Sequence, residues 1–225
     1  MSSTTLPLEG KPSWRGVLHQ FAAPLALGAG LVLLSIAPTM KARIAVAIFA
    51  ASLVTLFAVS ATYHRVTWSV VARDRMRRMD HASIFVLIAG TYTPLALLGL
   101  PDGTSLLITI WCMASIGIVQ SLFFVKAPKW VAAVLALAVG WTIVPWVPTV
   151  YASLTALELT LIAIGGVAYT SGALAYAFKR PNLIPGVFGY HEVFHALTLI
   201  GATAHFVMVL LLVRGATWGW VLPTM

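Results

Sequence analysis

Long apolar stretches, separated by short polar segments, fill almost the whole chain. A helix needs about 20 apolar residues to cross the hydrocarbon core of a bilayer, and most of the stretches are close to that length. Turn residues end two of them, at Pro38 and at Pro101-Asp102-Gly103. The fifth stretch, which carries Pro145, has the weakest pattern. We predict seven transmembrane helices, at about residues 17–37, 44–64, 80–100, 104–125, 130–146, 154–178 and 188–213.

Composition agrees with a chain that lies mostly in the membrane. Apolar residues make up 60% of the 225 residues and charged residues only 9%, whereas about a quarter of the residues of a soluble domain are charged. The predicted fold class is all-α, a polytopic seven-helix bundle. Residues 1–16 form a short cytoplasmic segment and residues 17–225 the transmembrane domain, with no room for a separate soluble domain. Cys112 is the single cysteine, so a disulfide within the chain is excluded.

Positive charge is divided unevenly between the two sides that seven spans define. The side of the amino terminus holds eleven Lys and Arg residues, and the opposite side holds three. The eleven are Lys11, Arg15, Arg65, Arg73, Arg75, Arg77, Arg78, Lys126, Lys129, Lys179 and Arg180, and the three are Lys41, Arg43 and Arg214. Because cytoplasmic loops are rich in Lys and Arg, we predict a multi-pass protein of the inner (plasma) membrane. Its amino terminus lies in the cytoplasm and its carboxyl terminus outside.

The net charge of +8 does not call for a nucleic-acid partner. In a membrane chain such charge reflects loops that face anionic lipid and the cytoplasm. We therefore expect no nucleic-acid binding.

Four ionisable side chains lie at cytoplasmic ends of predicted spans. His64 ends the second span, Asp80 begins the third, and His191 and His195 fall in the first two turns of the seventh. The topology places all four at one depth, where ionisable groups are costly and usually mark function. His191 and His195 are four residues apart and share a helix face. Together with a third imidazole, which His64 can supply, they are typical of a zinc site with a position open for water, so we predict Zn²⁺ as the cofactor.

Each residue near this constellation also has another interpretation. His81 lies on the same membrane side and competes with His64 as the third ligand, and spacing does not choose between them. Asp80 is a fourth ligand, or it orients the zinc-bound water and accepts its proton, or it only caps the third helix. Ser60, one turn before His64, hydrogen-bonds the site or a substrate oxygen, or else a carbonyl of its own helix.

Residues 191–195 also read as HExxH, the pattern of two ligands and a general base in soluble metalloproteases. The match is weak because no clear carboxylate ligand follows it, and Glu192 could equally point toward the headgroups. We assign His19 and His205 to ordinary helix packing. His205 follows His195 by ten residues, about 15 Å along a helix, and so cannot share its metal.

Together, these motifs resemble those of the hemolysin III branch of the progesterone and adipoQ receptor family. The matching segments are SATYH at 60–64, MDHASIF at 79–85, AGTYTP at 89–94 and GYHEVFH at 189–195, followed by His205-Phe206. The resemblance implies a seven-helix membrane bundle with its amino terminus inside. It also implies zinc held by His64, His191 and His195, which favours His64 over His81. It places Asp80 beside the zinc-held water and Ser60 in the same polar cluster.

Adiponectin receptors, which are similar to this branch, carry an amide residue where Glu192 stands, which argues against an obligatory base role for this residue. Those receptors and the alkaline ceramidases look like zinc-dependent lipid amidases. We therefore expect a hydrolase that acts on an amide or ester bond of a membrane lipid, with Asp80 and Ser60 as catalytic residues. We infer no obligatory protein partner.

Two other functions stay open. One is a receptor-like or lipid-homeostasis protein with a structural zinc, in which Asp80 is a direct ligand. The other is a cytolysin, although the polar residues cluster at one end of the spans and outline no polar lumen.

Overall fold

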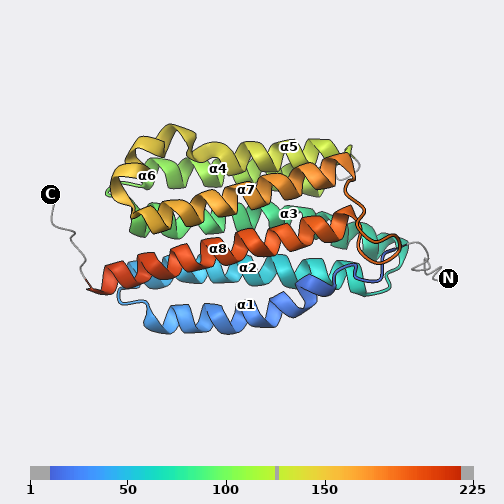
Figure 1. The fold of residues 1–225 in the computed structure, drawn as a ribbon, viewed down its shortest axis with the longest axis horizontal. Coiled ribbons are helices and arrows are strands. Elements are labelled where there is room, and N and C mark those ends of the chain that lie inside the picture. Colours follow the sequence, from blue (N-terminus) through green and yellow to red (C-terminus); the bar gives the residue numbers. More distant parts are fainter. Residues whose placement is uncertain (1–10, 125–126, 219–225) are drawn as a thin grey trace.

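The structure is a computed structural model that describes residues 11–124 and 127–218. The predicted end of the fourth span at Val125, the loop charge of Lys126, and the outer parts of the two predicted domains (1–10 and 219–225) lie outside these residues. The described chain is all-helical, apart from one isolated bridge between Ile184 and Phe188. Its helices run side by side along the long axis (Figure 1). They are α1 (Val17–Ile36), α2 (Met40–Arg65), α3 (Val70–Pro94), η1 (Leu95–Gly99), α4 (Thr104–Phe123), α5 (Lys129–Gly140), η2 (Trp141–Trp146), α6 (Val147–Ser153), α7 (Ala156–Phe178) and α8 (Tyr190–Trp218).

The seven predicted spans are confirmed, because seven helical segments of the described chain are long and apolar enough to cross a membrane. The fifth is the irregular one. Its α-helix α5 tightens into the 3₁₀ segment η2, which carries Pro145, and continues as α6 to Ser153. Proline lacks the backbone N–H and its ring disturbs the preceding turn, so the helix changes its hydrogen-bond pattern there. The span therefore extends seven residues beyond the predicted end at 146.

The predicted start of the third span at Asp80 is wrong, because α3 begins ten residues earlier, at Val70. The side chain of Ser69 accepts a hydrogen bond from the backbone N–H of Ala72 and so caps the helix. The first turns of α3 are rich in arginine, which hides them from a search for apolar stretches. Asp80 therefore lies inside the helix, and the interpretation of Asp80 as a helix cap is excluded.

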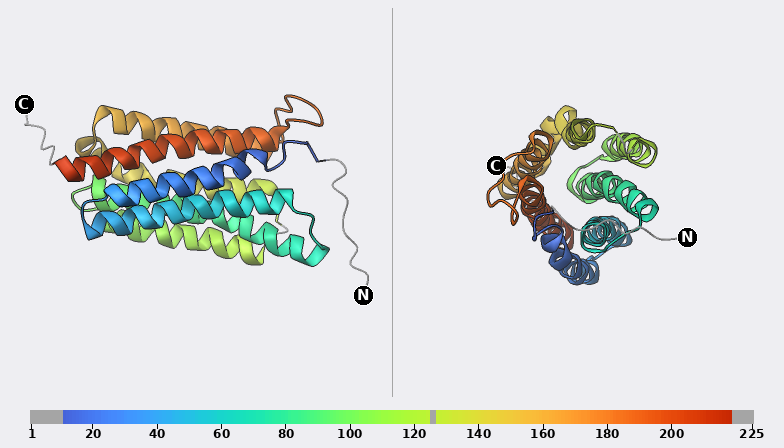
Figure 2. Two further views of the ribbon diagram at one scale, coloured as in Figure 1. Left: turned by 90° about the horizontal axis from the view of Figure 1, so that it is seen from below. Right: turned by 90° about the vertical axis from the view of Figure 1, so that its right-hand side faces the viewer.

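The helices form a closed bundle when seen end-on (Figure 2). Neighbouring spans contact each other in chain order, and α8 returns to contact α1, α2 and α3. The core holds large buried side chains such as Phe49, Phe85 and Met208. The outward faces carry exposed apolar side chains, among them Phe21 and Leu25 of α1. Such an apolar exterior suits lipid rather than water, so the chain is a multi-pass membrane protein.

The start of α1, the α2–α3 loop and the α7–α8 loop all lie at one end of the bundle, and α8 ends at the other (Figure 1). The first of these ends carries most of the described Lys and Arg residues. That this end faces the cytoplasm stays a prediction from charge.

Gly90 of α3 allows a close approach to α2. A Cβ atom at this position would lie 2.6 Å from the Cβ of Ser52 and closer still to its hydroxyl oxygen. Small residues at such crossings let the backbones of two membrane helices come together. The contact fixes α3 against α2, and these two helices carry Asp80 and His64.

We expect Gly90→Ala to destabilise the protein. Alanine is favoured over glycine in a free helix by about 1 kcal/mol, but overpacking a tight contact costs about 1–3 kcal/mol, so the clash should win. Gly166→Ala in α7 is the matched control, because nothing lies within 4 Å of its Cβ position. Thermal unfolding of the detergent-purified variants should show a lower Tm for Gly90→Ala only. Equal melting of the two variants would contradict the close packing of α2 and α3.

Candidate metal centre

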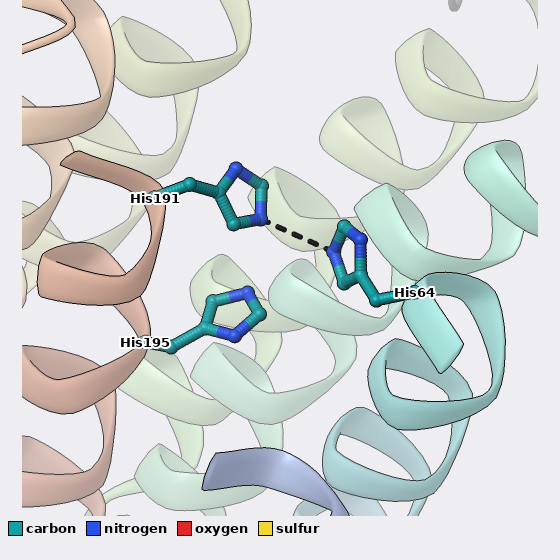
Figure 3. A group of neighbouring side chains, drawn as sticks. All are labelled: His64, His191 and His195. Carbon is teal, nitrogen blue, oxygen red and sulfur yellow. Dashed lines mark hydrogen bonds between the residues drawn. The ribbon is translucent and has the colours of Figure 1, made fainter. Parts of the chain in front are cut away.

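Three histidines from two helices meet at one end of the bundle. His64 lies in the last turn of α2, and His191 and His195 lie in the first two turns of α8. One ring nitrogen of each lies within 4.8 Å of those of the other two, and all three residues are buried. The Nε2 atoms of His64 and His191 are 3.1 Å apart, and the three rings turn toward a common space (Figure 3). The lateral proximity that the topology alone left open is thus present.

The geometry of this cluster fits a small divalent cation. Imidazole nitrogens bind zinc at about 2.0–2.1 Å, which places two ligands of a tetrahedral site roughly 3.3 Å apart. The His64–His191 separation of 3.1 Å is close to this value, and all three nitrogens lie within 4.8 Å of one another. Three neutral nitrogen donors suit Zn²⁺ and other late transition metals more than Mg²⁺ or Ca²⁺. Three protein ligands also leave one position of a tetrahedral ion open.

Asp80 of α3 completes the polar cluster. Its Oδ2 atom lies 3.9 Å from the Nε2 of His64, and the residue is buried. The side chain of Ser60, also buried and one turn before His64, is a hydrogen-bonding neighbour of this carboxyl group. The carboxylate is close enough to contact either a cation between the histidines or a water molecule beside it. The predicted set of five residues therefore comes together from α2, α3 and α8.

Glu192 has a structural role that its sequence motif did not suggest. Its Oε2 atom accepts a hydrogen bond from the backbone N–H of Gly189 at 2.9 Å, which caps the start of α8. Its Oε1 atom pairs with Nε of Arg15 at 2.5 Å. Both carboxylate oxygens are thus occupied away from the three imidazoles, and Glu192 is buried rather than turned toward headgroups. The match to HExxH thus gives two candidate ligands but no general base.

The segment before α1 closes the site from one side. The backbone N–H groups of Ser13 and Trp14 donate hydrogen bonds to the α7–α8 loop, to the carbonyls of Gly186 (3.0 Å) and Val187 (3.3 Å). Gly16 follows with a φ of 80°, and a Cβ atom there would lie 2.6 Å from the Cβ of His64. Glycine is thus needed both for the left-handed backbone and for the approach to the histidine. These contacts hold Arg15 over Glu192.

His19 contacts the centre in a way that the sequence did not predict. It packs between helices, as we expect for this residue, but its partner is the ring of His195, with centroids 3.9 Å apart and planes 10° from parallel. Both of its ring nitrogens are buried without a hydrogen-bond partner among the described residues. The signal was available, because His19 begins the first span on the same membrane side as the other histidines.

The other two histidines lie apart from the cluster. His81 does not belong to the group whose nitrogens converge in the described chain; it lines the cavity outside them. His205 contacts Tyr169 and lies near the carbonyl of Ile162 at 3.5 Å, deeper along α8. The separation of His205 from the metal candidate is therefore confirmed.

A cavity of about 450 Å³ joins the histidines to the surface at this end of the bundle. His64, His191 and Asp80 line it, together with Tyr63 and Tyr176. Its walls thus combine possible metal ligands with aromatic surface, as small-molecule sites commonly do.

Comparisons with known proteins agree with this architecture. The family model described as "Haemolysin-III related" matches residues 9–206. A protein named "Hemolysin-3 homolog" from Bacillus subtilis (strain 168) is 37% identical over 166 residues, which are 72% of this chain and 74% of the relative. "Hemolysin-3" from Bacillus cereus is 30% identical over 199 residues, covering 86% of this chain and 88% of the relative.

We expect Arg15→Ala to destabilise the protein more than Glu192→Gln does. Removing Arg15 leaves the carboxylate of Glu192, whose side chain is only 1% exposed, without its ion-pair partner. Breaking a buried pair in this way costs about 3–5 kcal/mol. Glutamine at 192 keeps an acceptor for the cap, and the guanidinium of Arg15, 17% exposed, can still reach water. We expect a loss of about 1 kcal/mol there, as for one hydrogen bond.

Thermal unfolding and metal analysis of the two purified variants test these expectations. Glu192→Gln should retain the metal content of the parent protein. A larger loss of Tm in Glu192→Gln than in Arg15→Ala, or the loss of its metal, would contradict the structural role of Glu192.

Proposed function

We propose a function for this chain, which belongs to the haemolysin-III related family. It is a membrane protein that binds zinc through His64, His191 and His195 and hydrolyses an amide or ester bond of a membrane lipid. The convergence of three buried imidazoles beside a buried carboxylate is the observation that carries the proposal. Fold and family alone would not establish a reaction.

The three imidazoles would bind the ion in their neutral form, because a coordinating nitrogen must be unprotonated. Burial favours that form, because removing an imidazole from bulk water destabilises its charged, protonated state. When bound, zinc supplies a Lewis acid that polarises a carbonyl and lowers the pKa of water in its open position. The aromatic neighbours of His191, among them Tyr176 at a ring-centroid distance of 5.5 Å, restrict its orientation.

Asp80 is the best-placed residue to move a proton. In our proposal its Oδ2 atom orients the attacking water and accepts its proton, then passes it to the leaving group, as a general base and acid. Ser60 holds the carboxyl group in position through its hydroxyl. These roles need no contribution from Glu192, whose oxygens are engaged by Arg15 and Gly189.

A lipid is the substrate class that suits the place of the site. The histidines lie in the end turns of membrane helices, where the apolar exterior gives way to polar loops. A lipid carbonyl lies at a similar depth, near the border between acyl chains and headgroups. With the charge-based orientation, the site would act on the cytoplasmic leaflet of the inner membrane.

A structural zinc site is a second candidate. The 3.9 Å between Asp80 and His64 is only slightly longer than the spacing of two direct ligands. With Asp80 as a fourth ligand, no position would be open for water, and the protein would serve as a receptor-like or lipid-homeostasis component.

Lysis is a third candidate, which rests only on the names of the relatives. Many of the buried polar residues of the described chain lie at the site end. Others, deeper in the bundle, such as Ser52, Thr91 and Thr93, donate hydrogen bonds to carbonyls of their own helices. Liposomes that hold the purified protein should therefore retain an encapsulated dye, and release of the dye would favour lysis.

Metal analysis tests the ligand set. We expect about one equivalent of zinc in the purified protein and less than a tenth of that in His64→Ala, His191→Ala and His195→Ala, because two remaining ligands bind weakly. His81→Ala and His205→Ala are the controls and should retain the metal. Zinc in the three cluster variants at the level of the controls would contradict the site.

Asp80→Asn separates the catalytic candidate from the structural one. If Asp80 acts on water, the variant should keep its zinc and lose hydrolysis of a lipid panel by about 10²–10⁴-fold, the usual contribution of a general base. Removal of zinc by a chelator should abolish hydrolysis by the parent protein, and added zinc should restore it. Loss of zinc from Asp80→Asn would instead favour direct ligation, and zinc-loaded protein inactive on every lipid would contradict the hydrolase.

A further inference from the structure

Four cationic side chains also line the 450 Å³ cavity, and because they are less buried than His64, Asp80 and His191 they form its outer part. Lys11 and Arg15 come from the segment before α1, and Arg73 and Arg77 come from the first turns of α3. Arg73 and Arg77 are four residues apart and share one face of the helix. Both are half-buried, whereas Arg75 between them is exposed. The helix face that carries Arg73 and Arg77 therefore lines the cavity, whereas Arg75 does not line it.

The carboxylates of the described residues neutralise only one of these four side chains, which form a cationic wall of the cavity. Arg15 pairs with Glu192, and Asp80 lies beside His64. Asp74 is the remaining acidic residue of the lining and is exposed. The ion pairs found in the described chain leave Lys11, Arg73 and Arg77 without a carboxylate within 4.0 Å.

The pKa of Lys11 also indicates that positive charges lie close together here. It is lowered, first because partial burial removes water from the ammonium group and then because the charges of Arg73 and Arg15 repel it. The attraction of an anion between these side chains would offset both effects. Such an arrangement is unfavourable by itself and becomes favourable when an anionic ligand is bound.

We infer that this cationic wall binds a phosphate group, so that the ligand of the cavity carries a phosphate next to the bond that reaches the histidines. The inference rests on the proposed function, because it names the substrate class of the same site. Two guanidinium groups on one face match the oxygens of a phosphate, which they bind in a bidentate manner. A carboxylate released by hydrolysis would arise at the histidines and not at this outer wall.

The distances along α3 agree with one molecule that spans both parts. Arg77 and Arg73 precede Asp80 by three and seven residues, which are about 5 and 10 Å along a helix. A glycerol-sized linker between a phosphate and an acyl carbonyl covers such a separation. The phosphate belongs either to a lipid headgroup or to a soluble phosphate compound, and the shared chemistry is the recognition of its oxygens.

Lipid retention by the purified protein tests the inference. Native mass spectrometry would compare phosphatidylglycerol with diacylglycerol of the same acyl chains, which lacks the phosphate, offered in equal amounts, and calorimetry would measure the binding of inorganic phosphate. Both are repeated after zinc is chelated, because phosphate can also bind a metal directly. The variants are Arg73→Ala, Arg77→Ala and, as the matched control, Arg75→Ala. The Tm of each variant shows that it is folded.

We expect at least a tenfold preference for phosphatidylglycerol in the parent protein and in Arg75→Ala, and a loss of at least tenfold in Arg73→Ala and Arg77→Ala. Arginine-dependent binding of inorganic phosphate without a lipid preference would also support the inference and would assign the phosphate to a soluble compound. An equal effect of all three substitutions, which indicates attraction to a basic surface in general, would overturn it. The absence of both kinds of binding, or binding that disappears with zinc, would overturn it as well.

The two proposals can fail separately. Arginine-dependent phosphate binding by chelated protein, together with inactivity of the zinc-loaded protein on every lipid, would remove the hydrolase and keep the phosphate site. Hydrolysis that is unaffected by Arg73→Ala and Arg77→Ala would remove the phosphate site and keep the hydrolase.

Discussion

The polar end of this bundle depends on one constraint: ionisable groups buried between membrane helices are largely removed from bulk water and need polar partners on neighbouring helices. His64 on α2, Asp80 on α3 and the histidine pair on α8 meet this constraint together. A single helix could not supply these partners, because most of its backbone donors and acceptors are already used in its own hydrogen bonds. The contact of α8 with α2 and α3 is therefore what turns separate polar residues into a site.

A second layer of contacts holds the cluster in place. Arg15 and Glu192 join the segment before α1 to the start of α8, and Gly16 lets that segment pass directly over His64. His19 adds a stacked ring on the other histidine of the α8 pair, His195. Side chains fixed in this way lose little further freedom when they bind a ligand, which is the physical basis of a preorganised site. The residues around the ligand set are thus as informative as the ligands themselves.

Two local sequence patterns differ from what the structure shows, for the same physical reason. The HExxH pattern places Glu192 where a general base stands in soluble metalloproteases, but its neighbours Arg15 and Gly189 occupy the carboxylate. Asp80 looked like a helix cap because the apolar stretch begins there, but the helix itself begins at Val70. A local pattern records neither the partners that arrive from distant segments nor helical turns that extend beyond the apolar region.

The sequence by itself determined the elements and their shared depth. Lengths of apolar stretches depend only on the thickness of a bilayer, so the seven spans could be predicted, with errors where arginines lengthen α3 and prolines interrupt the fifth span. Topology then placed His64, Asp80, His191 and His195 at one end. Only the tertiary structure decided that these residues meet, that His81 stays outside and that His19 packs against His195. Lateral position depends on which helix faces pack together, and that choice is made by many weak contacts between side chains far apart in sequence.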